Sequence, residues 1–240
     1  MFPDIIETDV IYAKHYPDNC SKPDLIVEVN GEEKFISVKT GMCPSAHQES
    51  YFAFRRFLER LHVSYRTLEI IRFFHFGDSK KLGTGDHPLT GDELSERFSP
   101  YFLEASKELD NERIIKAVVN RAVIRGTGST RRTIDFLYYG DLKNGKLLSK
   151  QEIYEIVLAN REHGKTAIHF GGLNYNPNSR KLASRDRNYV RIKWSILAFL
   201  YYCNDEQLAA IREKNIEREL IHILENLKKK LDIESLQLLY

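Results

Sequence analysis

The sequence predicts an α/β protein, and three features of the 240-residue chain predict it. Two apolar runs flank Asn30-Gly31, which is the pattern of a β-hairpin over residues 24–39. Apolar residues recur with helical spacing over residues 45–61, and an amphipathic stretch runs from Asp205 to the end of the chain. The hydrophobic fraction of 42% and the charged fraction of 29% are typical of a folded protein and exclude a disordered chain.

The predicted hairpin places an aspartate and a lysine on one face. Asparagine and glycine both tolerate the positive φ of a type I′ turn, so Val29 is expected to pair with Glu32. Counting outward sets Asp24 opposite Ser37, with Lys39 on the same face two residues further along. The apolar residues of the other face are expected to enter the core: Leu25, Val27, Val29, Ile36 and Val38.

The segment after the hairpin is expected to be a helix that brings a second acid close. Ser45 followed by Gln48 is the pattern of a capping box, which places the start of the helix at Ser45. Glu49 then lies in the first helical turn, at the end nearest the strand that carries Lys39. His47 and Gln48 lie beside it as groups that contact substrate or support the acid.

Asp24 and Lys39 form a pair suited to phosphodiester hydrolysis. Mg²⁺ is held by one or two carboxylates together with waters and substrate phosphate, and it polarises the phosphoryl oxygen. Asp24 supplies one carboxylate, and Lys39 can orient the attacking water or stabilise the charge that develops on the phosphate. A second acid is expected two residues before the lysine, where the chain has Ser37, so Glu49 is its candidate replacement.

Pro23-Asp24, Ser37-Val38-Lys39 and the downstream Glu49 together resemble the PD-(D/E)XK nuclease superfamily, which has the restriction endonuclease-like fold. The resemblance is to a variant whose second acid has moved to the following helix, and it covers residues 1–75. It implies a central mixed β-sheet flanked by helices, Mg²⁺ as cofactor with Mn²⁺ as a substitute, and cleavage of double-stranded DNA. By position, Asp24 and Glu49 hold the metal and Lys39 completes the catalytic set. The accessory residues are Ser37, Gln48 and Glu7.

Each residue of the motif also has an ordinary structural interpretation. Asp24 then caps the entry to a strand, Lys39 is a solvated edge charge, and Glu49 is an acid stabilised by a helix dipole. The chain contains two further Pro-Asp pairs, Pro3-Asp4 and Pro17-Asp18. Neither precedes a hairpin with a lysine on the returning strand, so the context selects the pair at Asp24.

Basic residues cluster in two segments, although the net charge of +2 does not by itself indicate nucleic-acid binding. One group surrounds Gly126-Thr127-Gly128-Ser129, and the other lies in a segment rich in Asn, Ser and Tyr. Such mixtures suit phosphate contacts, with Arg and Asn available for base edges. The alternative is two solvated loops. The predicted DNA-binding residues are Arg121, Arg125, Arg131, Arg132, Arg180, Lys181, Arg185, Arg187, Arg191 and Lys193.

The remaining segments are assigned from periodicity and turn residues. The predicted helices are 4–16, 92–109 with a break near Pro100, and 151–160 after a Ser149 cap. The predicted strands are 166–170, 189–194 and a second hairpin made of 114–124 and 133–139. Residues 68–76 fit a strand or a helix, and residues 77–88 fit an exposed loop.

The predicted organisation has a nuclease core in residues 1–110, a β-rich DNA-recognition part in residues 111–204, and an amphipathic helix in residues 205–240. One continuous domain is the alternative. The three cysteines lack metal-site spacing and indicate a reducing, cytoplasmic location. No apolar run has membrane-spanning length, and no glycine-rich loop has the ending of a nucleotide-binding loop, so neither a membrane nor a nucleotide cofactor is expected.

The function expected from the sequence is that of a Mg²⁺-dependent DNA endonuclease of restriction or defence type. A homodimer is expected with it, because a two-fold pair of active sites cuts both strands at a symmetric target. Two alternatives remain: a catalytically inactive DNA-binding member of the same fold, and a protein-interaction module that acts through the C-terminal helix.

Overall fold

The computed structural model describes most of the chain in two compact units, residues 1–199 and residues 200–240. The described residues are 10–16, 22–40, 45–78, 88–127, 132–140, 145–161, 168–181, 184–194, 204–210, 212–214, 216–218, 220–221 and 225. Glu7, Arg131 and the three cysteines lie outside these ranges.

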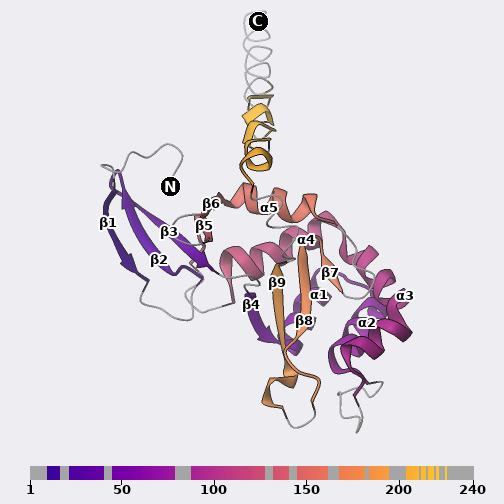
Figure 1. Cartoon of the computed structure of the whole chain (residues 1–240). Coiled ribbons are helices and arrows are strands. Elements are labelled where there is room, and N and C mark those ends of the chain that lie inside the picture. Colours follow the sequence, from indigo (N-terminus) through magenta and orange to yellow (C-terminus); the bar gives the residue numbers. More distant parts are fainter. Residues whose placement is uncertain are drawn as a thin grey trace, which may run out of the picture. The chain divides into compact units, whose positions relative to one another are not determined.

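The first unit contains a mixed five-stranded sheet, shown in Figure 1. Among the strands that the structure describes, β3 and β5 pair in parallel, and the other neighbours are antiparallel. The strands in spatial order are β1 (Val10–His15), β2 (Leu25–Val29), β3 (Glu32–Lys39), β5 (Phe136–Tyr139) and β6 (Lys146–Ser149). A mixed sheet with helices packed against it is the fold class that the sequence predicts, so that prediction is confirmed.

The hairpin of β2 and β3 has the predicted register. Asn30 and Gly31 have φ values of 51° and 79°, and Val29 pairs with Glu32. Val27, Val29 and Ile36 are buried together with a leucine from β6. The alternation of apolar and polar residues therefore fixes which face of this hairpin enters the core.

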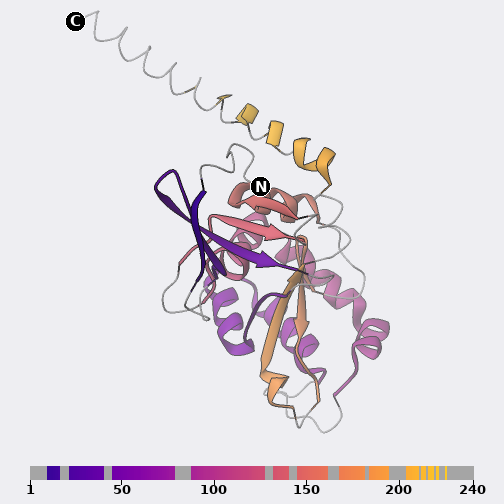
Figure 2. The ribbon, with the colours of Figure 1, turned by 60° about the vertical axis from the view of Figure 1, so that its left-hand side comes forward.

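A second, four-stranded sheet lies beside the helices, as Figures 1 and 2 show. All of its neighbouring pairs are antiparallel. The strands in spatial order are β4 (Ser45–Ser50), β9 (Tyr189–Trp194), β8 (Leu173–Pro177) and β7 (His169–Phe170). Alternate residues of β9 are buried, which agrees with one face of the sheet packing against helices.

The helices contact both sheets. Helices α1, α2 and α3 contact β9, β8 and β7 respectively, while α5 contacts β5, β6 and α4. The helix bounds are α1 (Tyr51–Arg60), α2 (Tyr65–Phe76), α3 (Gly91–Leu109), α4 (Glu112–Val119) and α5 (Lys150–Ala159). A π-helical turn, Asn120–Arg125, continues α4, and a 3₁₀ turn, Arg185–Asn188, precedes β9.

A buried aromatic cluster joins α1, α2 and β8. The His75 ring stacks on Tyr51 at 4.5 Å between centroids, and its Nδ1 lies 2.8 Å from the Tyr175 hydroxyl. Its Nε2 lies 2.9 Å from the backbone oxygen of Arg187. Burial lowers the pKa of His75 to about 3, so this histidine is neutral at physiological pH.

The prediction of a helix from Ser45 is wrong for its first six residues. Ser45–Ser50 is strand β4, paired with β9, and the helix begins at Tyr51 after Ser50 as N-cap. The backbone donors and acceptors of this polar segment are used in a sheet ladder with a strand far along the chain. A local capping pattern does not reveal such a partner.

Three other assignments are also corrected. Residues 10–15, predicted to be helical, form β1, and the predicted second hairpin is instead α4 with the π-helical turn followed by β5. Helix α3 continues through Pro100 without the predicted break. By contrast, β9 and α5 form as expected, and Ser149 with Glu152 makes a capping box at the start of α5. Residues 68–76, for which the sequence leaves both a strand and a helix open, belong to α2.

The five-stranded sheet takes strands from both sides of residue 110, so the predicted nuclease and recognition parts share one sheet. In the second unit, the described residues from Asp205 to Glu225 are helical. Ile216, Leu220 and Ile221 are between 54% and 58% exposed there. Within the described parts of the chain, no helix is both long and apolar enough to cross a membrane.

Candidate active site

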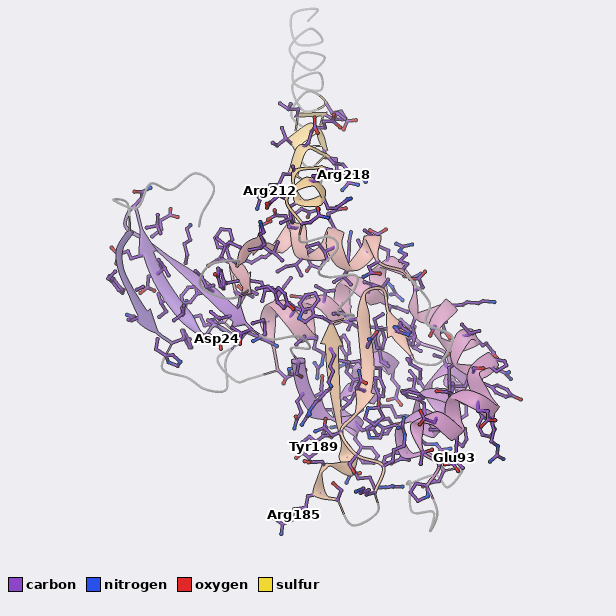
Figure 3. The ribbon with its side chains drawn as sticks, in the orientation of Figure 1. Asp24, Glu93, Arg185, Tyr189, Arg212 and Arg218 are labelled. Atoms are coloured by element: carbon purple, nitrogen blue, oxygen red, sulfur yellow. The ribbon has the colours of Figure 1, made fainter. Side chains whose placement is uncertain are left out.

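Asp24 stands directly before β2 and is held by the neighbouring strand β3. Its backbone N–H donates to Ile36 O at 2.8 Å. Its carboxylate Oδ2 accepts hydrogen bonds from Ser37 Oγ at 2.9 Å and from the Val38 N–H at 2.6 Å. Figure 3 shows Asp24 near the start of β2. Two donors from β3 therefore fix the orientation of this carboxylate.

Lys39 completes the pair that the hairpin predicts. Its Nζ lies 3.6 Å from Asp24 Oδ2 and donates to Val38 O at 3.2 Å. Its side chain is 21% exposed, whereas that of Asp24 is 43% exposed. The parallel pairing of Lys39 with Tyr139 places the end of β3 between β2 and β5. Asp24, Ser37 and Lys39 thus lie together, as the register predicts.

Lys22 is a second cation of this site that the sequence reasoning missed. Its Nζ donates a hydrogen bond to Ala46 O. Burial is the main cause that lowers the pKa of Lys22 to about 7, and Lys39 adds to the shift while Asp24 and Glu49 oppose it. Its place two residues before Asp24 is the one sequence signal that could have identified it.

Glu49 lies on β4, not on a helix, and its carboxylate is engaged by an arginine. Arg121 Nε and Nη2 donate to the two Glu49 oxygens at 2.8 and 2.6 Å. His47 Nε2 lies 3.3 Å from Oε1. Burial raises the pKa of Glu49, but the bonds from Arg121 and His47 outweigh it, so the pKa falls below its ordinary value. Glu49 is therefore charged, buried and paired.

The residues near Asp24 fit a hard cation through a single carboxylate. Among the described residues, the hydrogen bonds to the Asp24 carboxylate come to Oδ2 and none comes to Oδ1. One carboxylate with waters and a substrate phosphate is a donor set that Mg²⁺ accepts. Within the described residues, no three His, Cys, Asp or Glu side chains converge on one point where they could hold a metal.

The first predicted group of basic residues lies in different surroundings. Arg121 pairs with Glu49, and Arg125 is exposed at the edge of a cleft. The Arg132 guanidinium lies over the Phe35 ring at 5.1 Å. Of the described residues of this group, Arg125 and Arg132 are therefore exposed, whereas Arg121 is half-buried.

The second group divides into anchors and exposed residues. Arg187 is 6% exposed and pairs with buried Asp78 at 2.9 Å, while Arg180 donates to Phe74 O at 3.0 Å. Both arginines hold the β8–β9 hairpin to α2, and their contact with phosphate stays a prediction. Lys181 and Arg185 are exposed.

The tip of the β8–β9 hairpin projects from the first unit. Figure 3 shows Arg185 pointing away from the body there, with Tyr189 nearby. On β9, Arg191 Nε donates to Gln48 Oε1 of β4 at 3.1 Å, and Lys193 lies in register with Asn174. The half-buried cations Arg191 and Lys193 therefore lie among amide side chains on this side of the second sheet.

The fold and this site define an α/β protein with a mixed central sheet and an aspartate-lysine pair at the end of a hairpin. No family model matches the chain, and no curated protein sequence matches it. One similar solved structure is the restriction endonuclease MspI in complex with its cognate DNA, with a TM-score of 0.43 and 17% identity. The alignment covers 78% of this chain and 71% of that chain.

Proposed function

We propose that this chain is a metal-dependent DNA endonuclease that hydrolyses phosphodiester bonds, of the restriction or defence type. The observation that carries the proposal is the Asp24 carboxylate, oriented by two donors from β3 and accompanied by Lys39 at 3.6 Å. Charge-assisted hydrogen bonds of this kind preorganise a carboxylate for a ligand.

Each residue of the hairpin has a defined task in this proposal. Asp24 would hold Mg²⁺, or Mn²⁺ in its place, which supplies Lewis acidity at the phosphate and lowers the pKa of water. Ser37 and the Val38 N–H keep the carboxylate in one orientation. Lys39, anchored on Val38 O, presents an ammonium that orients the attacking water or stabilises charge developing on the phosphate.

Glu49 takes a different place from the one that the motif suggests. Arg121 donates to both oxygens of Glu49, so a cation bound there would share a carboxylate that already has a charged partner. The Arg121 guanidinium already compensates the charge of this carboxylate, which disfavours a further cation there. His47 adds no charge at physiological pH, because burial lowers its pKa. We therefore assign the metal to Asp24 alone and give Glu49 the role of holding Arg121.

The test is incubation of the purified protein with supercoiled plasmid and with mixed genomic DNA, with Mg²⁺ or with EDTA. Discrete Mg²⁺-dependent fragments are expected from the wild type, and none from Asp24→Ala or Lys39→Ala. Asp92→Ala and Lys107→Ala, which change exposed residues of α3, are the matched controls. Unchanged cleavage by either hairpin variant would remove the proposed site.

A second candidate is a DNA-binding protein of the same fold that does not cut. Ser37 at the position of an expected acid, and a single available carboxylate, favour it. This candidate predicts salt-sensitive DNA binding in EDTA with no cleavage after Mg²⁺ or Mn²⁺ is added, across several DNA sources.

A further inference from the structure

A basic cleft of about 490 Å³ opens between α1 and the end of α4 with its π-helical turn. Its polar lining residues are Arg60, Asn120, Arg121, Arg125, Gly126 and Thr127. None of the residues that line it is acidic. A cleft with guanidinium, amide and hydroxyl donors and without carboxylates suits an anion.

The arginines of the cleft differ in whether their charge is already paired within the protein. Arg121 is fixed by Glu49 and lies over the Phe57 ring at 4.7 Å, so its charge is already compensated. Arg60 and Arg125 are exposed and form no ion pair within the described residues. Their two positive charges are therefore available to a ligand.

The cleft adjoins the Asp24 site. Gly126 packs against Lys22 so closely that a Cβ added there would lie 2.9 Å from Lys22 Cγ. Lys22 in turn interacts electrostatically with Asp24 and Lys39. Thr127 Oγ1 lies 3.5 Å from His47 Nε2, next to the Glu49 pair. A nucleic-acid strand at Asp24 can thus continue along these residues.

We propose that this cleft binds a backbone phosphate of the DNA strand, next to the phosphodiester group that is cut, through Arg60 and Arg125. The inference rests on the proposed function and names a binding site for its substrate. Two guanidinium forks can each make paired hydrogen bonds to phosphate oxygens. Asn120 and Thr127 add neutral donors, and the glycine at position 126 lets the backbone approach Lys22 closely.

The experiment measures the affinity for a fluorescein-labelled DNA duplex in EDTA over a series of salt concentrations. Arg60→Ala and Arg125→Ala are each expected to weaken binding several-fold and to reduce the slope of log K against log salt by about 0.9. Arg97→Ala, which removes an exposed arginine of α3 outside the cleft, is the matched control and is expected to change neither quantity.

If Arg60 and Arg125 instead stabilise the ends of their helices, their removal affects protein stability and not DNA binding. Arg60 lies in the last turn of α1 and Arg125 in the last turn of the π-helical segment, where cations offset the helix dipole. Lower thermal stability with unchanged DNA affinity and unchanged salt slope would assign them to that role and overturn the phosphate site.

Further results distinguish DNA phosphate from free phosphate, and separate a failure of the cleft from a failure of the proposed nuclease activity. Calorimetric binding of inorganic phosphate that is lost in the Arg60→Ala/Arg125→Ala double variant, with unchanged duplex affinity, would assign the cleft to free phosphate and overturn the DNA proposal. Because binding is measured in EDTA, weakened binding by both variants supports the cleft even if the wild type never cuts. If the wild type cuts DNA and both variants bind it as the wild type does, the phosphate site in the cleft is rejected and the proposed nuclease activity stands.

Discussion

Ser37 contributes to the candidate site as a hydrogen-bond donor where a carboxylate is expected from the motif. It is 1% exposed, and its hydroxyl points at Asp24 Oδ2. We expect Ser37→Ala to lower the cleavage rate roughly ten-fold, because a hydrogen bond to a charged acceptor contributes about 1.5 kcal/mol. DNA affinity in EDTA should not change. Single-turnover cleavage measures this, with Ser45→Ala on β4 as control; equal rates for wild type and Ser37→Ala would show that Asp24 keeps its orientation without this hydroxyl.

A substitution of Glu49 tests whether this residue holds Arg121 or binds the metal. Because Arg121 occupies both carboxylate oxygens, we expect Glu49→Gln to lower the free energy of unfolding by about 2 kcal/mol. The Mg²⁺ concentration for half-maximal cleavage should stay the same. Denaturant unfolding and a Mg²⁺ titration of cleavage measure the two effects. A large rise in the Mg²⁺ requirement, with stability unchanged, would return Glu49 to the role of metal ligand.

The residues of the site differ in how far the sequence could predict them. The contact of Asp24 with Ser37 and Lys39 followed from a short hairpin, because the turn residues fix the register. The partner of Glu49 is Arg121, 72 residues away, and no local pattern joins them. Lys22 is likewise recognisable only once Ala46 and Gly126 surround it.

At the scale of elements, local sequence patterns predicted the secondary structure correctly where the capping residues and the apolar spacing indicated the same element. Helix α5 formed at its Ser149 cap, whereas the β-branched run after Asn111 became helix α4. The buried residues Ile114, Ile115, Val118 and Val119 recur at helical spacing. The Asn111 side chain also accepts from Arg113 N–H at 3.0 Å, so a helix signal was present and β propensity concealed it.

The contact between α2 and β8 predicts a pH dependence of stability. The folded pKa of His75 is about 3, below its ordinary 6.5, so protonation favours the unfolded chain. Its contribution is complete above pH 6.5 and is lost as the pH falls toward 3, at about 1.4 kcal/mol per pH unit. Urea unfolding at several pH values should show this slope, and His75→Gln should flatten it between pH 6 and pH 4. An identical slope in both proteins would assign the acid sensitivity to other groups.

The arginines of the β8–β9 hairpin give a prediction that distinguishes a residue that stabilises the fold from one that contacts DNA. Arg187→Met leaves buried Asp78 without its guanidinium, so we expect about 3 kcal/mol lower stability. Arg185→Ala removes an exposed charge at the tip, so stability should stay unchanged while DNA affinity falls. Thermal unfolding and duplex binding in EDTA measure the two variants. The reverse pattern would mean that Arg187 contacts DNA and that Arg185 is structural.

At the scale of the whole molecule, the described helix of the second unit presents exposed aliphatic residues that a dimer would cover. Ile216 and Leu220 are one helical turn apart, and both are more than half exposed. Burying each of them in an interface contributes roughly 1.5 to 3 kcal/mol, enough to support association with a second copy of the chain. A dimer would carry two Asp24 sites, as cutting both strands of a symmetric target requires.

We therefore expect the 240-residue protein to sediment as a dimer and Ile216→Asp/Leu220→Asp to sediment as a monomer. The variant should nick supercoiled plasmid where the wild type linearises it, because a single Asp24 site hydrolyses one strand per encounter. Glu217→Gln changes an exposed residue of the same helix and should behave as wild type. A wild-type monomer that linearises plasmid would show that one chain cuts both strands in turn, and would leave the aliphatic residues of this helix with no part in cleavage.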